Sequence, residues 1–164
     1  MRPARLTDDT ALMRLESAAW SPEAGFPSVF ERVTATGAPF FGADNPPDAH
    51  LVAELNGSVV GYIRLKAPSR LPENAHVMQV QGLAVHPSAR RRGIGAMLLT
   101  AAVRRTRERG ARKLTLRVLS TNTGAIALYE RLGFAREGVL RGEFIINGRD
   151  VDDVLMAIPL QAHT

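Results

Sequence analysis

Cysteine is absent from this chain of 164 residues. Its absence excludes a disulfide scaffold, a thiolate metal site and a cysteine nucleophile. Aromatic residues make up only 5% of the chain, and no apolar run approaches the ~20 residues of a membrane span. The N-terminus also lacks the apolar segment of a signal peptide. These absences predict a soluble cytoplasmic protein without a membrane partner.

Apolar residues nevertheless make up 45% of the chain, which is enough for a packed core. The length fits one domain over residues 1–164. Hydrophobic periodicity, caps and turn residues predict alternating strands and helices in an α/β or α+β fold, with helices on both faces of one sheet. The expected strands are Met1–Arg5, Leu51–Leu55, Val59–Leu65, His76–Val85, Lys113–Leu119, Ala135–Ile145 and Val151–Ile158. One expected helix follows a cap at Thr7 or Asp8, and the other expected helices are Ser28–Thr36, Gly93–Arg109 and Asn122–Leu132. Ser21–Pro27 and Asp44–Asp48 are expected loops.

The net charge of +5 is concentrated in one segment. Residues 86–113 carry nine basic groups and one acidic group, whereas residues 1–85 are net −2 and residues 114–164 are net −1. Such a local excess favours an anionic ligand. The alternative is a solvated, arginine-rich helix face. For Arg104–Arg112, the sequence indicates only this alternative.

The front of the basic segment combines several features of an anion site. The apolar strand Leu83–Val85 runs into a basic turn, and a helix follows directly. A helix N-terminus offers unpaired amides and partial positive charge, and Gly93 and Gly95 allow close backbone approach. A Walker A loop is absent, and Leu98 stands where a dinucleotide fingerprint needs its third glycine. Because glycine also occurs in turns without a ligand, this loop alone does not establish a site.

A second pattern begins at Asn122, 26 residues after Ala96. Asn122, Ala125 and Tyr129 are spaced to share one helix face. Asn122 is a candidate helix cap and Tyr129 a candidate aromatic at the edge of the core. The apolar residues Ile126, Leu128 and Leu132 already supply packing, however, which leaves the polar pair to be explained.

Together the two motifs resemble those of the GNAT superfamily of acyl-CoA-dependent N-acetyltransferases. The resemblance rests on Arg90-x-x-Gly93-x-Gly95-Ala96, on Asn122-x-x-Ala125-x-x-x-Tyr129, and on Leu132-Gly133-Phe134. It implies a mixed, largely antiparallel sheet of six to seven strands with a V-shaped split between the central strands, flanked by about four helices. It also implies transfer of an acetyl group from acetyl-CoA to a primary amine by direct attack in a ternary complex.

The resemblance implies a coenzyme A site in the first motif. The backbone amides of Arg91, Arg92, Gly93, Ile94, Gly95 and Ala96 would bind the pyrophosphate, while Arg90 and its neighbours add positive charge. The strand Leu83, Ala84 and Val85 would lie along the pantetheine arm. The Leu83 amide would bind the thioester oxygen and stabilise the oxyanion, an interaction worth ~3 kcal/mol. Asn122 and Ala125 would contribute from the second motif.

Tyr129 is expected to act as the general acid that protonates the leaving thiolate. Many relatives carry a glutamate as the base on the strand before the cradle, but here Gln79 and Gln81 occupy the candidate positions. Glutamine cannot accept a proton at neutral pH. The base is therefore open between a water molecule held by Gln81 and an acid elsewhere. The other candidates are Glu143, Asp152 and Asp153, with His76 and His86 less favoured. The histidines at positions 50, 76, 86 and 163 lack metal-ligand spacing, so no metal is expected.

The acceptor is an amine of a small molecule or of a peptide N-terminus. The run Glu137–Phe144, followed by Asp152–Met156, resembles relatives with such acceptors, although a solvated hairpin edge also explains its charges. The segment Trp20–Pro47, with Trp20, Phe26, Phe30, Phe40 and Phe41, is expected to form another wall of the acceptor pocket. Two other functions are possible: a non-catalytic acyl-CoA sensor, and a nucleic-acid binder, which the lack of aromatics in the basic cluster disfavours. Dimers are common among relatives, so a homodimer is also an expectation.

Overall fold

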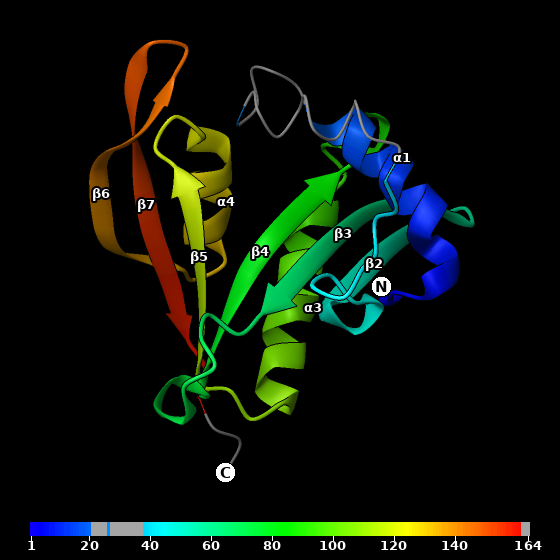
Figure 1. The fold of residues 1–164 in the computed structure, drawn as a ribbon, viewed down its shortest axis with the longest axis horizontal. Coiled ribbons are helices and arrows are strands. Elements are labelled where there is room, and N and C mark those ends of the chain that lie inside the picture. The colour runs from blue at the N-terminus through cyan, green and yellow to red at the C-terminus, as the bar shows by residue number, and fades with distance from the viewer. Residues whose placement is uncertain (21–25, 27–37, 162–164) are drawn as a thin grey trace. The chain divides into compact units, whose positions relative to one another are not determined.

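The computed structural model describes residues 1–20, 26 and 38–161. The expected helix Ser28–Thr36, most of the expected loop Ser21–Pro27, Phe30 and His163 lie outside the described residues. Figure 1 shows the described elements: strands β1 (Arg2–Pro3), β2 (His50–Leu55), β3 (Ser58–Lys66), β4 (Val77–Val85), β5 (Lys113–Leu119), β6 (Ala135–Ile146) and β7 (Arg149–Pro159), and helices α1 (Asp9–Ala19), α3 (Ile94–Glu108) and α4 (Thr123–Arg131).

The strands form a seven-stranded sheet with the order β1-β2-β3-β4-β5-β7-β6. The pairs β1–β2, β2–β3, β5–β7 and β6–β7 are antiparallel, and β4–β5 is parallel. This mixed, largely antiparallel sheet confirms the predicted fold class. The three α-helices of the described residues compare with an expected number of about four.

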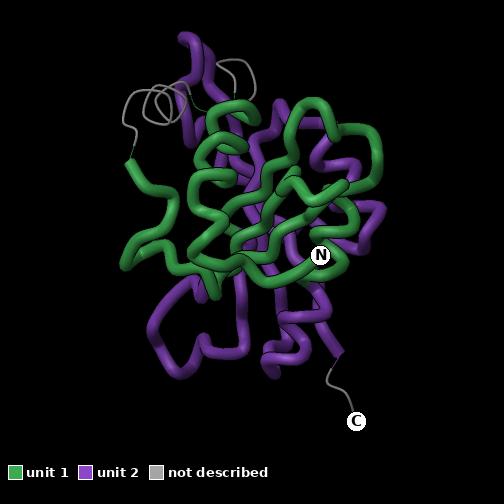
Figure 2. Tube along the Cα trace, turned by 90° about the vertical axis from the view of Figure 1, so that its right-hand side faces the viewer, with its two compact units in different colours: residues 1–65, 81–102 green, residues 66–80, 103–164 purple. Residues whose placement is uncertain are grey.

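The chain divides into two compact units, coloured separately in Figure 2. Unit 1 comprises residues 1–65 and 81–102, and unit 2 comprises residues 66–80 and 103–164. Strand β4 and helix α3 each contribute residues to both units. That residues 1–164 act as one domain stays a prediction.

In unit 1, strands β2 and β3 are covered on both faces, which explains why β2 is buried at four consecutive positions, His50–Ala53. On one face, Tyr62 packs in a core cluster with Leu12 and Leu15 of α1. On the other face, Gly61 lies so close to α3 that an added Cβ would be 3.1 Å from a methyl carbon of Leu98. Alternate residues of β3 therefore face different helices.

The start of α1 is fixed by an ion pair rather than by the expected side-chain cap. Asp8 occupies the N-cap position but makes no cap hydrogen bond. Its carboxylate instead accepts bonds from Arg2 Nη1 at 2.8 Å, Arg2 Nη2 at 2.7 Å and the Arg5 amide at 2.7 Å. The Arg2 guanidinium holds the pKa of the buried Asp8 carboxyl below its usual 3.8.

We expect Asp8→Asn to lower the free energy of unfolding by about 2 kcal/mol at pH 7, because buried acceptors of charged donors are lost. A depressed carboxyl pKa stabilises the fold above the unfolded pKa, and this contribution disappears as the pH falls through the folded pKa. The difference between variant and wild type should therefore shrink below about pH 4. Urea denaturation at pH 7 and pH 3 measures it. Glu54→Gln is the control, since Glu54 also pairs with Arg2 but its side chain is 42% exposed, and an equal loss in both variants would contradict the argument.

Unit 2 is built on β5, β6 and β7 with α4. The register of β5 against β7 runs unbroken from Lys113↔Pro159 to Leu119↔Asp153, whereas β6 is mostly exposed and contains two register shifts against β7. The two buried side chains of α4 are Ile126 and Tyr129. Ile126 packs as expected, Leu128 and Leu132 are partly buried, and the buried ring of Tyr129 agrees with its interpretation as an aromatic at the edge of the core.

The parallel pairing of β4 with β5 is short. It covers Val77, Met78 and Gln79, opposite Lys113, Leu114 and Thr115. Among the described residues, the remaining six positions of β4 have no register partner in β5.

Candidate active site

The turn between β4 and α3 has an unusual backbone conformation. After β4 ends at Val85, a 3₁₀ turn covers Pro87–Ala89, and α3 begins at Ile94. Between them, Arg91 and Gly93 both have positive φ, at 64° and 74°. Positive φ is readily adopted by glycine but uncommon for arginine, and residues held this way cluster at ligand sites.

This conformation leaves a row of backbone amides available. The Met97 amide donates to Gly93 O at 3.0 Å, as the first bond of the helix. No described residue accepts a hydrogen bond from the amides of residues 91–96. Consecutive free amides at the start of a 15-residue helix form a concave donor surface that suits phosphate oxygens. The segment thus fits the pyrophosphate of coenzyme A, the group that the sequence predicted for it.

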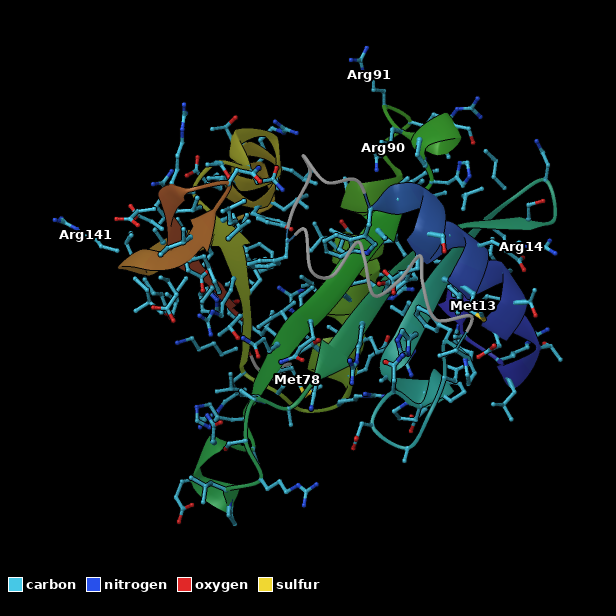
Figure 3. All side chains as sticks on the ribbon, turned by 45° about the horizontal axis from the view of Figure 1, so that its top comes forward. Met13, Arg14, Met78, Arg90, Arg91 and Arg141 are labelled. Carbon is cyan, nitrogen blue, oxygen red and sulfur yellow. The ribbon has the colours of Figure 1, made fainter. Side chains whose placement is uncertain are left out.

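The three arginines of this turn differ in their contacts. The Arg90 guanidinium donates to Val85 O at 3.3 Å and to Ala19 O at 3.0 Å, so it ties the turn to the end of α1. Arg91 and Arg92 are exposed, and neither pairs with any described residue. Figure 3 shows Arg91 projecting outward from the turn, while Arg90 lies close to the ribbon. Arg91 and Arg92 are therefore the side chains of the turn that are free to meet a phosphate.

The second half of β4 carries the residues expected along the pantetheine arm. Ala84 is buried in the core, and Leu83 and Val85 are partly buried. Beside them, an added Cβ on Gly82 would lie 3.3 Å from Tyr62 Cε2 and 3.4 Å from Tyr62 Oη. The absence of a side chain at Gly82 thus lets the Tyr62 phenol lie against the backbone of β4, one residue before Leu83.

Glu16, an acidic residue that was not expected from the sequence to be functional, lies in the same part of unit 1. Glu16 Oε1 accepts hydrogen bonds from Trp20 Nε1 at 2.6 Å and from Tyr62 Oη at 2.7 Å. Burial, and then the charge of Glu16, raise the pKa of the Tyr62 phenol well above 10. The spacing of four residues between Glu16 and Trp20 was a signal in the sequence for their contact on one helix face, but the contact with Tyr62 was not visible there.

In unit 2, Asn122 caps α4. Its Oδ1 accepts a bond from the Ala125 amide at 3.2 Å, and its side chain is exposed. The interpretation of Asn122 as a helix cap is thus confirmed. The cap uses the side-chain oxygen, so the amide group of Asn122 keeps its donors for another partner.

Tyr129 combines a buried ring with an unpaired hydroxyl. Its ring centroid lies 6.0 Å from that of Phe134, and 9% of the residue is exposed. Oη makes no hydrogen bond with a described residue. Fully buried polar atoms without a partner occur in other described residues but not at Tyr129, so this oxygen is not fully buried. Burial raises the pKa of the phenol above its usual 10. The phenol is therefore protonated at neutral pH and has access to a ligand.

The other base candidates are mostly engaged. Asp153 is buried and forms an ion pair with Arg117, and Asp152 Oδ1 accepts a bond from the Gly142 amide at 2.8 Å. His86 Nδ1 lies 3.1 Å from the Ser88 amide and 2.8 Å from Ser88 Oγ. Glu143 is exposed. Within residues 1–20, 26 and 38–161, no cluster of histidine, cysteine, aspartate or glutamate has the arrangement of a metal site.

A comparison with family models decides the family to which the fold belongs. Residues 10–134 match the model of the Acetyltransferase (GNAT) family. The chain belongs to this family. The acetyltransferase is 34% identical to an N-alpha-acetyltransferase of Sulfurisphaera tokodaii, over 98% of this chain and 92% of the relative. Both predictions, a GNAT fold and an N-acetyltransferase that uses acetyl-CoA, are confirmed, and neither alternative function is favoured.

Two further relatives show how far the likeness extends. A [Ribosomal protein bS18]-alanine N-acetyltransferase of Salmonella typhimurium is 38% identical over 48% of this chain. The matched part covers about half (53%) of that relative's length. The solved structure of yncA, a putative acetyltransferase from Salmonella typhimurium with its cofactor acetyl-CoA, superposes with a TM-score of 0.74. It covers 99% of this chain and 94% of its own, at 23% identity, and so shows the shared fold. None of the described helices is long and apolar enough to span a membrane.

Proposed function

We propose that this acetyltransferase acetylates the α-amino group at the N-terminus of a peptide or protein. The observation that carries the acceptor class is the N-alpha-acetyltransferase of Sulfurisphaera tokodaii, which aligns with nearly the whole chain. The free amides of residues 91–96 support the donor side, because they provide several donors for one doubly charged pyrophosphate. Bound acetyl-CoA supplies the acetyl group as a thioester.

The cofactor-binding residues divide the work between backbone and side chains. The amides of residues 91–96 bind the pyrophosphate, and Arg91 and Arg92 add positive charge. Arg90 holds the turn against Val85 O and Ala19 O, which fixes the direction of the amides. Leu83, Ala84 and Val85 lie along the pantetheine arm, and the Asn122 side-chain amide donates to the cofactor.

Two groups act on the reacting atoms. The Leu83 amide donates to the carbonyl oxygen and stabilises the negative charge that develops there, an effect worth ~3 kcal/mol. Tyr129 donates its phenolic proton to the sulfur as the C–S bond breaks. Because burial keeps the phenol protonated, this acid is present over the pH range in which the amine is a nucleophile.

A transfer assay with an amine panel tests the function. Purified protein, acetyl-CoA and short peptides with different first residues are combined, and thiol release is followed while mass spectrometry locates the acetyl group. We expect transfer to free α-amino groups and none to the same peptides with blocked N-termini. Transfer only to lysine side chains, polyamines or free amino acids would refute the acceptor class. Tight binding of acetyl-CoA without transfer to any amine would identify a sensor instead.

A cytoplasmic location and a homodimer belong to the same proposal. The homodimer is measured by light scattering of the purified chain, and the location by fractionation of the source cells. A monomeric mass at working concentrations would remove the homodimer without affecting the proposed reaction.

A further inference from the structure

The carboxylate of Glu16 is fixed at one oxygen and open at the other. Oε1 accepts both bonds, from Trp20 Nε1 and Tyr62 Oη. Oε2 makes no hydrogen bond with any residue that the structure describes, and Glu16 is partly exposed near the last turn of α1. An ionised carboxylate accepts about four bonds through its two oxygens. Glu16 therefore has acceptor capacity left for a ligand.

The negative charge of Glu16 is also not neutralised. Both partners are neutral donors, and no described arginine, lysine or histidine forms an ion pair with it. Arg64, the cation near Tyr62, donates instead to Asp44 O. The side-chain oxygen of a neutral residue such as glutamine can also accept the bonds from Trp20 and Tyr62. The packing of the two rings thus does not account for a charged group here.

The position of Glu16 relates it to the reacting strand within unit 1. Its partner Tyr62 is 5% exposed and lies against β4 at Gly82, next to Leu83. The C-terminal end of α1 is further tied to the cofactor turn through Arg90 and Ala19 O. Glu16 is therefore hydrogen-bonded to a buried phenol, and this phenol lies beside the backbone that carries the proposed oxyanion donor.

We propose that Glu16 is the carboxylate that binds the acceptor's ammonium group and takes its first proton. The proposal rests on the proposed transfer to an α-amino group. The ammonium donates to Oε2, and one proton passes to Glu16 and then to solvent, which frees the nitrogen lone pair. The N–C bond forms at the thioester carbonyl, the C–S bond breaks, and Tyr129 gives its proton to the sulfur. The second proton that the nitrogen loses restores the Tyr129 phenol, so one proton is released per turnover.

Several other candidate residues cannot take a proton or already form hydrogen bonds or ion pairs. Gln79 and Gln81 cannot take a proton. Asp152 is bonded to an amide and Asp153 to Arg117, whereas Glu54 and Asp8 pair with Arg2. Glu16 combines an open oxygen, an unpaired charge and a fixed position beside β4.

Glu16→Gln tests the proposal, since the glutamine oxygen still accepts from Trp20 and Tyr62 while the charge is removed. We expect kcat/KM for the acceptor peptide to fall about tenfold or more, because a bond to a charged group is lost. KM for acetyl-CoA and the melting temperature should stay unchanged. Glu73→Gln is the matched control: Glu73 is exposed and lies in the turn Pro72–Asn74, and its substitution should change none of these values.

Trp20 provides a readout that does not depend on turnover, because it is the chain's single tryptophan and donates to Glu16. In the presence of coenzyme A, a peptide with a free N-terminus should change the Trp20 fluorescence of the wild type. The same peptide with an acetylated N-terminus should not, and Glu16→Gln should lose the response. Tyr62→Phe, which keeps the charge of Glu16 but removes one of its donors, should lower kcat/KM for the acceptor by a smaller factor.

The outcomes separate the two proposals. Wild-type kcat/KM and an unchanged fluorescence response in Glu16→Gln would overturn the role of Glu16 and leave it as the acceptor for Tyr62 alone. If the wild type acetylates only a non-peptide amine, the proposed acceptor class fails, and a loss in Glu16→Gln with that amine still supports its role. An enzyme that neither transfers to any amine of the panel nor shows a fluorescence response would overturn both.

Discussion

Replacing Tyr129 by phenylalanine should lower kcat about 100- to 1,000-fold, because loss of a positioned general acid removes roughly 10²–10⁴ in rate. The substitution removes only Oη, which makes no hydrogen bond with a described residue. The ring stays and keeps its contact with Phe134, whose centroid is 6.0 Å away. The folded state therefore loses little, and the affinity for acetyl-CoA should be nearly unchanged.

Thiol release at saturating substrates measures kcat, and calorimetric titration measures acetyl-CoA binding. Phe134→Leu is the matched control, because it disturbs the packing of the Tyr129 ring but leaves the hydroxyl in place. It should lower the melting temperature more than Tyr129→Phe does and lower kcat less. In the wild type, the raised pKa of Tyr129 predicts that the acid is lost only above pH 10. Full turnover in Tyr129→Phe would remove Tyr129 from the mechanism.

Replacing Gly93 by alanine should weaken acetyl-CoA binding by at least about 100-fold, since misdirecting two amides removes hydrogen bonds to a charged group that contribute roughly 1.5–3 kcal/mol each. Gly93 has a φ of +74° at the centre of the free amides. A Cβ there would meet no other atom within 4 Å. The expected effect thus comes from backbone strain and not from a steric clash.

Gly57→Ala is the matched control for Gly93→Ala. Gly57 has a φ of +80°, also with no atom within 4 Å of an added Cβ, and it lies in the turn between β2 and β3. Both variants should lose similar stability, about 1 kcal/mol. Only Gly93→Ala should lose affinity for acetyl-CoA, as measured by titration calorimetry, with kcat at saturation changed much less. Equal affinities in the two variants would show that the turn does not bind the cofactor.

Much of the fold could be predicted because its signals are local. The expected strand Lys113–Leu119 matches β5 at both ends, and the expected helix Gly93–Arg109 differs from α3 by one residue at each end. Alternation of apolar residues, glycine after a helix and Asn-Gly turns each act over a few neighbouring residues. Gly110, expected just after the long helix, indeed has a positive φ of 80°.

The side-chain partners depended on residues far apart in the chain. Asp8 was expected as a cap, but Arg2 takes its carboxylate through the pairing of β1 with β2. Tyr129 was left open between an aromatic at the edge of the core and a polar functional group, and only the structure shows its ring buried beside Phe134. Spacing along a helix shows which residues share a face, but not what packs against that face.

By itself, the sequence determined the order of the elements, the two motifs and hence the reaction class, because a phosphate-binding helix start and a helix face are encoded within a few residues. Only the tertiary structure decided which groups remain available for chemistry. It showed that the amides of residues 91–96 are unpaired, that Arg90 is bonded to backbone oxygens, and that Glu16 meets Tyr62 across 46 residues. Hydrogen-bond partners over such separations are set by how strands and helices pack, and no local pattern specifies them.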